Sequence, residues 1–157
     1  MSKIIKVSTD LKITVHDFPE GTLYDQSKQL CELIGNGCDM IENVMPRRLY
    51  RELGHTTHVT SKDSKCVSML VDEEFLSRSN SKPNMIGCYL YGTDKHGSPI
   101  LGNVLFVGNE YRNDGISFCG IEEATFNLLY KQLMDLAGKA TRVDTMQLRE
   151  TRANQDE

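Results

Sequence analysis

Three consecutive acidic residues, Asp72, Glu73 and Glu74, follow an apolar run at residues 67–71. Carboxylates at the end of a strand can act as a general acid and a general base, or bind a hard cation through oxygen ligands. Such a triplet is also typical of a charged turn that faces water, because ionised side chains are costly to bury without partners. The residues lack the regular acidic spacing of a calcium loop, so the pattern favours the turn over a catalytic or metal site.

A basic segment at residues 46–65 could bind a different class of ligand. The segment has a local charge of +3, whereas the whole chain has a net charge of −4. Its basic residues are Arg47, Arg48, Arg51, Lys62 and Lys65, and its acidic residues are Glu52 and Asp63. Arginine binds phosphate through two parallel hydrogen bonds, and Tyr50 within the segment could stack on a nucleotide base. The candidate ligands of a small anion are therefore Arg47, Arg48, Arg51 and Lys65. Charge clusters of this kind are more often solvated surface, which is the alternative interpretation.

Asn84 and two histidines are further polar candidates. Asn84 follows Pro83 and precedes a short apolar pattern, so it could contact a ligand, but its position is more typical of a helix N-cap. His55 and His58 lie three residues apart without a third ligand at metal-site spacing, so no metal site is predicted. The sequence contains neither a G-x-S-x-G motif nor a complete phosphate-binding loop, so we assign no catalytic residue and no cofactor.

The composition restricts the class of protein. The chain of 157 residues is 39% hydrophobic and 25% charged, which is typical of one soluble globular domain. Its net negative charge disfavours a general nucleic-acid binder, although nucleic acid is not excluded as a partner. The five cysteines are scattered without a C-x-x-C pair, which indicates reduced thiols. No apolar stretch is long enough for a signal peptide or a membrane span, so a cytoplasmic protein without membrane contact is expected.

The hydrophobic pattern at the N-terminus predicts two strands and a helix. Apolar and polar side chains alternate strictly over residues 11–16 and loosely over residues 3–8, and the two runs predict a β-hairpin. Thr22 is a typical N-cap with Asp25 three residues further on, and Gly35 is a typical C-terminal stop. These signals predict a helix that begins after the cap and ends before the glycine.

Later segments complete an α+β pattern. The predicted strands are 38–45, 67–71 and 100–108, and the predicted helices are 84–91 and 121–137. The strand at 100–108 is almost wholly apolar and is predicted to be central. We predict a single globular domain over residues 1–138, with a small mixed or mainly antiparallel sheet and helices packed on one face. Gly138 is predicted to end the last helix, and residues 139–157 are predicted to form a flexible charged C-terminal tail.

Four segments share an order and spacing with a known family; they are Leu33–Glu42, Val71–Glu74, Pro83–Asn84 with Cys88–Tyr91, and Ile100–Gly108. In this respect the chain resembles the uncharacterised family catalogued as domain of unknown function 3846, found mainly in phages and large DNA viruses. The resemblance would cover about residues 3–137. In this chain Phe75 takes the place of a family glycine after the acids, and Lys82 that of a leucine before the proline. The resemblance implies the fold and a viral or phage-like setting, and it implies no activity.

From the sequence we expect a small intracellular accessory protein that acts as a binding module for a protein partner or a small anionic ligand. One alternative is an enzyme or metal site that uses Asp72 and Glu73, and another is a structural component of a larger assembly or particle. The absence of a complete catalytic constellation favours binding over catalysis. The sequence does not predict the oligomeric state.

Overall fold

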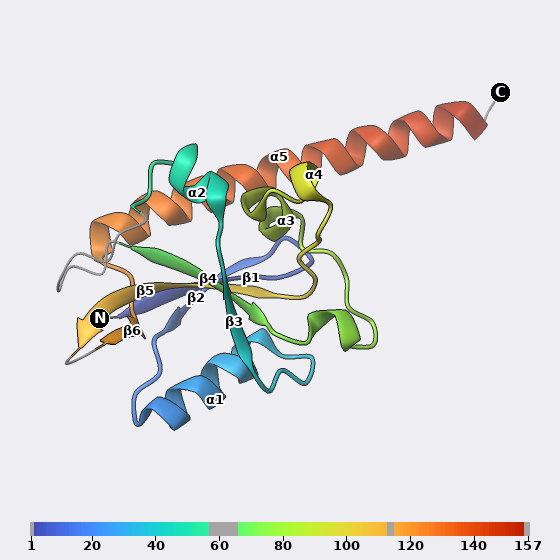
Figure 1. Ribbon diagram of the computed structural model, residues 1–157. Helices are drawn as coiled ribbons and strands as arrows, with labels where there is room; N and C mark the ends of the chain where they lie inside the picture. The colour runs from blue at the N-terminus through green and yellow to red at the C-terminus, as the bar shows by residue number, and fades with distance from the viewer. Residues whose placement is uncertain (1, 57–65, 113–114, 156–157) are drawn as a thin grey trace.

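β5 (Val104–Arg112) is the central strand, in agreement with the prediction from its apolar composition. The computed structural model describes residues 2–56, 66–112 and 115–155. β5 pairs with β1 and β4 along its first half and with β6 along its second half. All pairings between these strands are antiparallel, in the order β2-β1-β5-β4-β3 with β6 beside β5 (Figure 1). The other strands are β1 (Lys3–Val7), β2 (Ile13–Asp17), β3 (Ile41–Val44), β4 (Val67–Asp72) and β6 (Gly115–Cys119).

Helices cover both faces of this sheet. The helices are α1 (Leu23–Ile34), α2 (Arg47–Arg51), α3 (Met85–Tyr91), α4 (Thr93–His96) and α5 (Glu123–Gln155), with a 3-10 turn, η1, at Phe75–Ser77. On one face, α2, α3 and α5 pack against a core that includes Val104 and Phe106 of β5. On the other face, α1 packs against Leu105 and Val107 of the same strand. Successive side chains of a strand point to opposite faces, so the unbroken apolar run of β5 needs cover on both sides.

The predicted α+β class and mainly antiparallel sheet are confirmed. α3 and α5 share one face as predicted, together with α2, which was not predicted, whereas α1 lies on the opposite face. The N-terminal hairpin and α1 occur where expected, and Thr22 and Asp25 form the predicted capping box. Two short helices, α2 and α4, lie in segments that the sequence pattern left irregular, because neither is long enough to show a helical period.

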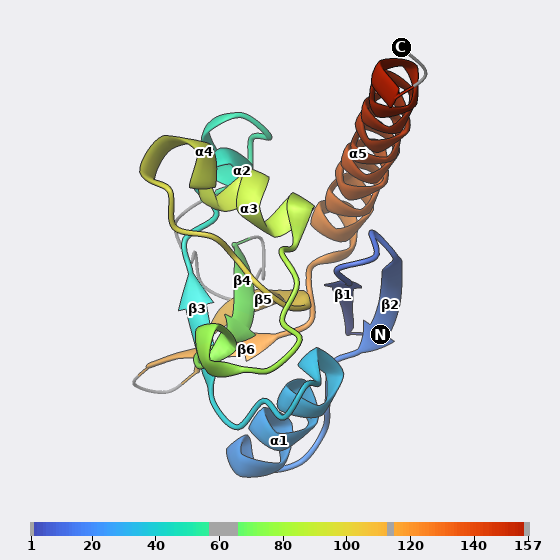
Figure 2. The ribbon, with the colours of Figure 1, turned by 90° about the vertical axis from the view of Figure 1, so that its right-hand side faces the viewer.

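α5 continues beyond the residue at which the sequence predicted its end. Gly138 lies inside the helix and has no positive φ, so it does not adopt the left-handed conformation of a C-terminal stop. The helix runs on through residues 139–155, where a flexible tail was predicted. Figures 1 and 2 show this last part of α5 projecting away from the rest of the protein. Within the described residues, no helix combines the length and the apolar content that crossing a membrane requires.

Candidate functional site

Arg48 joins α2 to α3 and α4 and does not stand free as an anion ligand. Its guanidinium donates two hydrogen bonds to the carboxylate of Asp94, at 2.6 and 2.7 Å, and a third to the carbonyl oxygen of Tyr89 at 2.8 Å. It also lies over the ring of Tyr89, 4.6 Å from the ring centroid, and 3.5 Å from a carboxylate oxygen of Glu52. A phosphate at this position would have to displace Asp94 and would face a second carboxylate.

Two other candidates of the basic segment lie on the same short helix as Arg48. Arg47 and Arg51 are exposed on α2, a helix of only five residues. Lys65 lies outside the described residues. Tyr50 donates its hydroxyl hydrogen to the carbonyl oxygen of Val67 at 2.7 Å, and burial raises its pKa to about 12. Its hydroxyl therefore fixes α2 to β4.

The pair between Arg48 and Asp94 is expected to stabilise the fold only when Asp94 is ionised. Hydrogen bonds from Arg48 lower the pKa of Asp94 below its ordinary value of 3.8. A lowered carboxyl pKa contributes stability above the ordinary value and loses it as the pH falls through the folded value. Asp94→Asn should therefore lower the urea midpoint near pH 7, and its difference from wild type should be smaller near pH 3, below the ordinary pKa of 3.8.

Asp10→Asn, at an exposed carboxylate in the β1–β2 turn, is the control for this measurement. It should leave the urea midpoint unchanged near neutral pH. A difference between Asp94→Asn and wild type that is equally large at both pH values would contradict an ionic role for the pair.

Asp72 is a buried partner of Arg78. Arg78 donates to one carboxylate oxygen of Asp72 at 2.9 Å, and the backbone N–H of Glu74 donates to the other oxygen at the same distance. The Asp72 side chain is 5% exposed. Arg78 also lies 3.5 Å from the carboxylate of Glu74 and 3.7 Å from that of Asp39. This cluster closes the turn after β4, so Asp72 is neither a solvated turn residue nor a free carboxylate.

The acidic triplet does not form a paired acid and base. Asp72 is buried against Arg78 whereas Glu73 is exposed, so the two carboxylates do not share one site. In the part of the chain that the structure describes, no group of three His, Cys, Asp or Glu side chains is placed to hold a metal ion. Burial raises the pKa of the Cys38 and Cys66 thiols, which makes them poorer nucleophiles.

Asn84 and His55 make internal contacts. Asn84 is completely buried and caps α3, its side-chain oxygen accepting a hydrogen bond from the N–H of Gly87 at 2.9 Å. The cap interpretation of Asn84 is thus confirmed. His55 is 6% exposed and lies 2.6 Å from the side-chain oxygen of Gln132 on α5. His58 lies outside the described residues.

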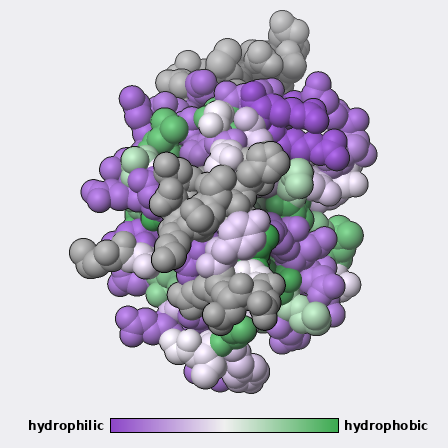
Figure 3. Space-filling view, turned by 60° about the vertical axis from the view of Figure 1, so that its left-hand side comes forward, coloured by the Kyte–Doolittle hydropathy of each residue, from purple (hydrophilic) through white to green (hydrophobic). Residues whose placement is uncertain are grey.

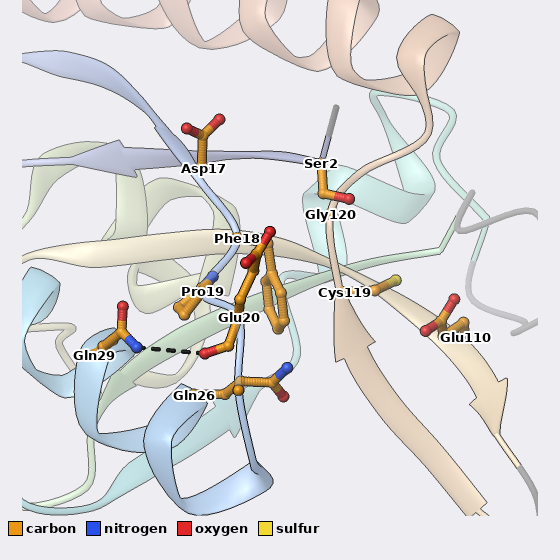
Figure 4. A pocket seen from close by; sticks show the side chains of 11 residues that line it. Ser2, Asp17, Phe18, Pro19, Glu20, Gln26, Gln29, Glu110, Cys119 and Gly120 are labelled. Carbon is orange, nitrogen blue, oxygen red and sulfur yellow. Dashed lines mark hydrogen bonds between the residues drawn. The ribbon is translucent and has the colours of Figure 1, made fainter.

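A large cleft lies between the β2–α1 loop, α1, β5 and β6, where no sequence pattern predicted a site (Figure 4). Its volume is about 840 Å³. The carboxylates of Asp17, Glu20 and Glu110 and the amides of Gln26 and Gln29 line it. Asp17 accepts a hydrogen bond from Lys3 at 2.7 Å, so part of this negative charge is already neutralised. The lining suits a cationic or hydrogen-donating group, opposite in charge to the anion expected from the basic segment.

An apolar groove lies between α3 and α5. It has a volume of about 270 Å³ and is lined by Met85, Ile86, Tyr89, Leu136, Lys139 and Ala140. Met85 is 39% exposed and Tyr89 40% exposed, so the walls are open to an incoming side chain. On the face shown in Figure 3, hydrophobic residues appear as separate patches among hydrophilic ones. In the α3–α5 groove, apolar side chains from two helices lie side by side.

No family model matches the chain, and neither curated proteins nor solved structures give a match. The resemblance to the family catalogued as domain of unknown function 3846 accordingly stays a prediction. The class that the fold itself defines is a small α+β domain with helices on both faces of an antiparallel sheet.

Proposed function

We propose that this protein is a binding module for a helical segment of a protein partner. The observation that carries the proposal is the apolar α3–α5 groove, in which Lys139 is the one cation among the described lining residues. Grooves between helices bind amphipathic helices by accepting apolar side chains spaced three or four residues apart. The hydroxyl of Tyr89 donates to Glu52 at 3.0 Å while Arg48 lies over its ring, so this wall is held in place before a partner arrives.

Binding of a small anionic ligand has less support. Arg48, the central arginine of the basic segment, is occupied by Asp94. Arg47 and Arg51 stay exposed on α2 and are the residues that such a ligand would use. The intracellular, viral or phage-like setting belongs to our proposal and rests on the sequence alone.

Two further functions have weaker arguments. An enzyme or metal site that uses Asp72 and Glu73 would need the buried carboxylate of Asp72 to leave Arg78. A structural component of a larger assembly would use the α3–α5 groove and also the projecting end of α5. Such a component would differ from a binding module in the number of partners that it joins.

The proposed function predicts that a charge placed in the groove abolishes capture of a partner. Met85 is the first residue of α3, where an added carboxylate is favourable to the helix, so Met85→Glu should fold normally. Burying this charge should weaken binding by at least about tenfold, since tenfold corresponds to only about 1.4 kcal/mol. Wild type and variant would be used as baits in extracts of the native host, with quantitative mass spectrometry of the captured proteins.

Leu128→Glu is the matched control, because Leu128 is 48% exposed on α5 and does not line the groove. A partner is expected with wild type and Leu128→Glu and is lost with Met85→Glu. Capture of the same proteins in equal amounts by all three baits would refute the groove as the binding surface.

A further inference from the structure

Two cysteines, Cys31 and Cys38, lie close together at the C-terminal end of α1. Cys31 is in the last turn of the helix, and Cys38 is in the loop that leads to β3 (Figure 1). The backbone N–H of Gly35 donates to the carbonyl oxygen of Cys31 at 2.8 Å, and the N–H of Cys38 donates to the carbonyl oxygen of Gly35 at 3.1 Å. Gly35, Asn36 and Gly37 all have positive φ, of 76°, 53° and 78°. The chain therefore reverses sharply after α1 and returns Cys38 to the side of Cys31.

The two thiols face one cavity. The cavity lies between α1 and the loop, has a volume of about 550 Å³, and is lined by both cysteines. Burial and a side-chain hydrogen bond with Cys31 raise the pKa of the Cys38 thiol, whereas the positive charge of Arg78 acts in the opposite direction. Cys31 is 7% exposed and Cys38 is half-buried, so a small molecule in the cavity meets the Cys38 sulfur first.

We propose that Cys31 and Cys38 are a redox-active dithiol, which a low-molecular-weight disulfide such as glutathione disulfide converts into an intramolecular disulfide. In the first step the Cys38 thiolate attacks one sulfur of the small disulfide, forms a mixed disulfide and releases one small thiol. In the second step the Cys31 thiolate attacks the Cys38 sulfur and releases the second small thiol. The two protons of the protein thiols leave on the two small thiols, and the two electrons of the oxidised pair reduce the small disulfide.

The disulfide closes a ring of eight residues between the end of α1 and the segment before the edge strand β3. The next residue, Asp39, lies 3.7 Å from the guanidinium of Arg78, so the ring lies directly beside the ion pair of Arg78 and Asp72. A cross-link restricts the unfolded chain, so the oxidised protein should unfold at a higher urea concentration than the reduced protein. The inference concerns α1 and its loop, and it is independent of the α3–α5 groove.

The experiment exposes the reduced, folded full chain to an excess of glutathione disulfide at mildly alkaline pH, followed by acid quenching, alkylation and digestion with trypsin. Trypsin releases both cysteines in one peptide, residues 29–47, and each of the other three cysteines in a peptide of its own. In wild type this peptide should be lighter than the reduced peptide by two hydrogen atoms and take up no alkylating agent. Treatment with dithiothreitol should restore both thiols.

Two variants identify the order of the steps and the pair. Cys31→Ser lacks the second thiol, so the reaction should stop at the mixed disulfide and residues 29–47 should carry one glutathione group on Cys38. Cys88→Ser is the matched control, because Cys88 is also half-buried but its sulfur is bonded to the backbone of Ile100. It should form the same disulfide as wild type. Far-UV circular dichroism verifies that both variants keep the fold.

Three outcomes in wild type overturn the inference. The first is a peptide 29–47 that still carries two free thiols after the treatment. The second is one glutathione group on each cysteine without a ring, because the two sulfurs then do not reach each other. The third is a ring that forms only when urea has unfolded the protein, because the native reversal after α1 then does not bring the thiols together.

Discussion

Asn84→Ala is expected to destabilise the protein by about 3 kcal/mol, because the side chain satisfies three backbone groups, two of them through buried hydrogen bonds. Its amide nitrogen donates to the carbonyl oxygens of Val7 and Gly102, both at 3.0 Å, and its oxygen accepts from the N–H of Gly87. Alanine would remove all three hydrogen bonds, two of which are buried, and each buried group left unsatisfied costs about 1–3 kcal/mol. The measurement is the free energy of unfolding from urea denaturation.

Two further variants separate the contributions of Asn84. Thr22→Ala removes the N-cap of α1, which is exposed to water, and should cost only about 1 kcal/mol. Asn84→Asp keeps a capping oxygen but loses both donated hydrogen bonds and places a carboxylate against two carbonyl oxygens. It should therefore be at least as unstable as Asn84→Ala. Equal losses for Thr22→Ala and Asn84→Ala would mean that Asn84 acts as a cap alone.

Sequence reasoning succeeded where the signal is local. The capping box of Thr22 and Asp25 and the cap at Asn84 depend on residues within four positions, so residue type and spacing were sufficient. The remaining role of Asn84 joins it to Val7, which lies 77 positions earlier in the chain. No pattern in the sequence indicates that the carbonyl group of Val7 lies beside α3. The cap could be predicted, but the reason for its complete burial could not.

The extent of the helices was harder to predict than their existence. Gly138 has the residue type of a helix stop, but a stop requires a positive φ, which residue type alone does not determine. α2 follows Pro46 and has five residues, of which Leu49 is completely buried. One buried residue gives no periodicity, so this helix follows from tertiary packing and not from pattern.

Apart from Asn84, the candidate site residues were chosen by charge, and the structure shows why charge alone was insufficient. Arg48 and Asp94 are 46 positions apart, and their pairing turns a candidate anion ligand into a link between helices. Asp72 and Arg78 are only six positions apart, so this ion pair could have been predicted from the sequence. The α3–α5 groove had no local signal, because its walls come from segments about 50 positions apart.

Gly108→Ala is expected to destabilise the protein by about 3 kcal/mol, at the upper end of the range for overpacking. Gly108 lies in β5, opposite Cys119 of β6. A Cβ atom there would collide with the carbonyl oxygen of Gly120, and would lie 3.1 Å from its carbonyl carbon and 3.3 Å from the sulfur of Cys119. Relief requires movement of backbone, because the atom in collision belongs to the main chain.

The surrounding sheet leaves little room for that movement. β4 pairs with Gly108 through Val67 on the other side of β5, and the chain after β6 is tied to β1 by a hydrogen bond from Ile121 to Lys3. Gly115→Ala is the matched control, since it lies in the same hairpin and nothing stands within 4 Å of the added Cβ. Its free energy of unfolding should stay within about 0.5 kcal/mol of wild type. Equal urea midpoints for the two variants would show that β6 can move away from β5, and the close contact at Gly120 would then not constrain the sheet.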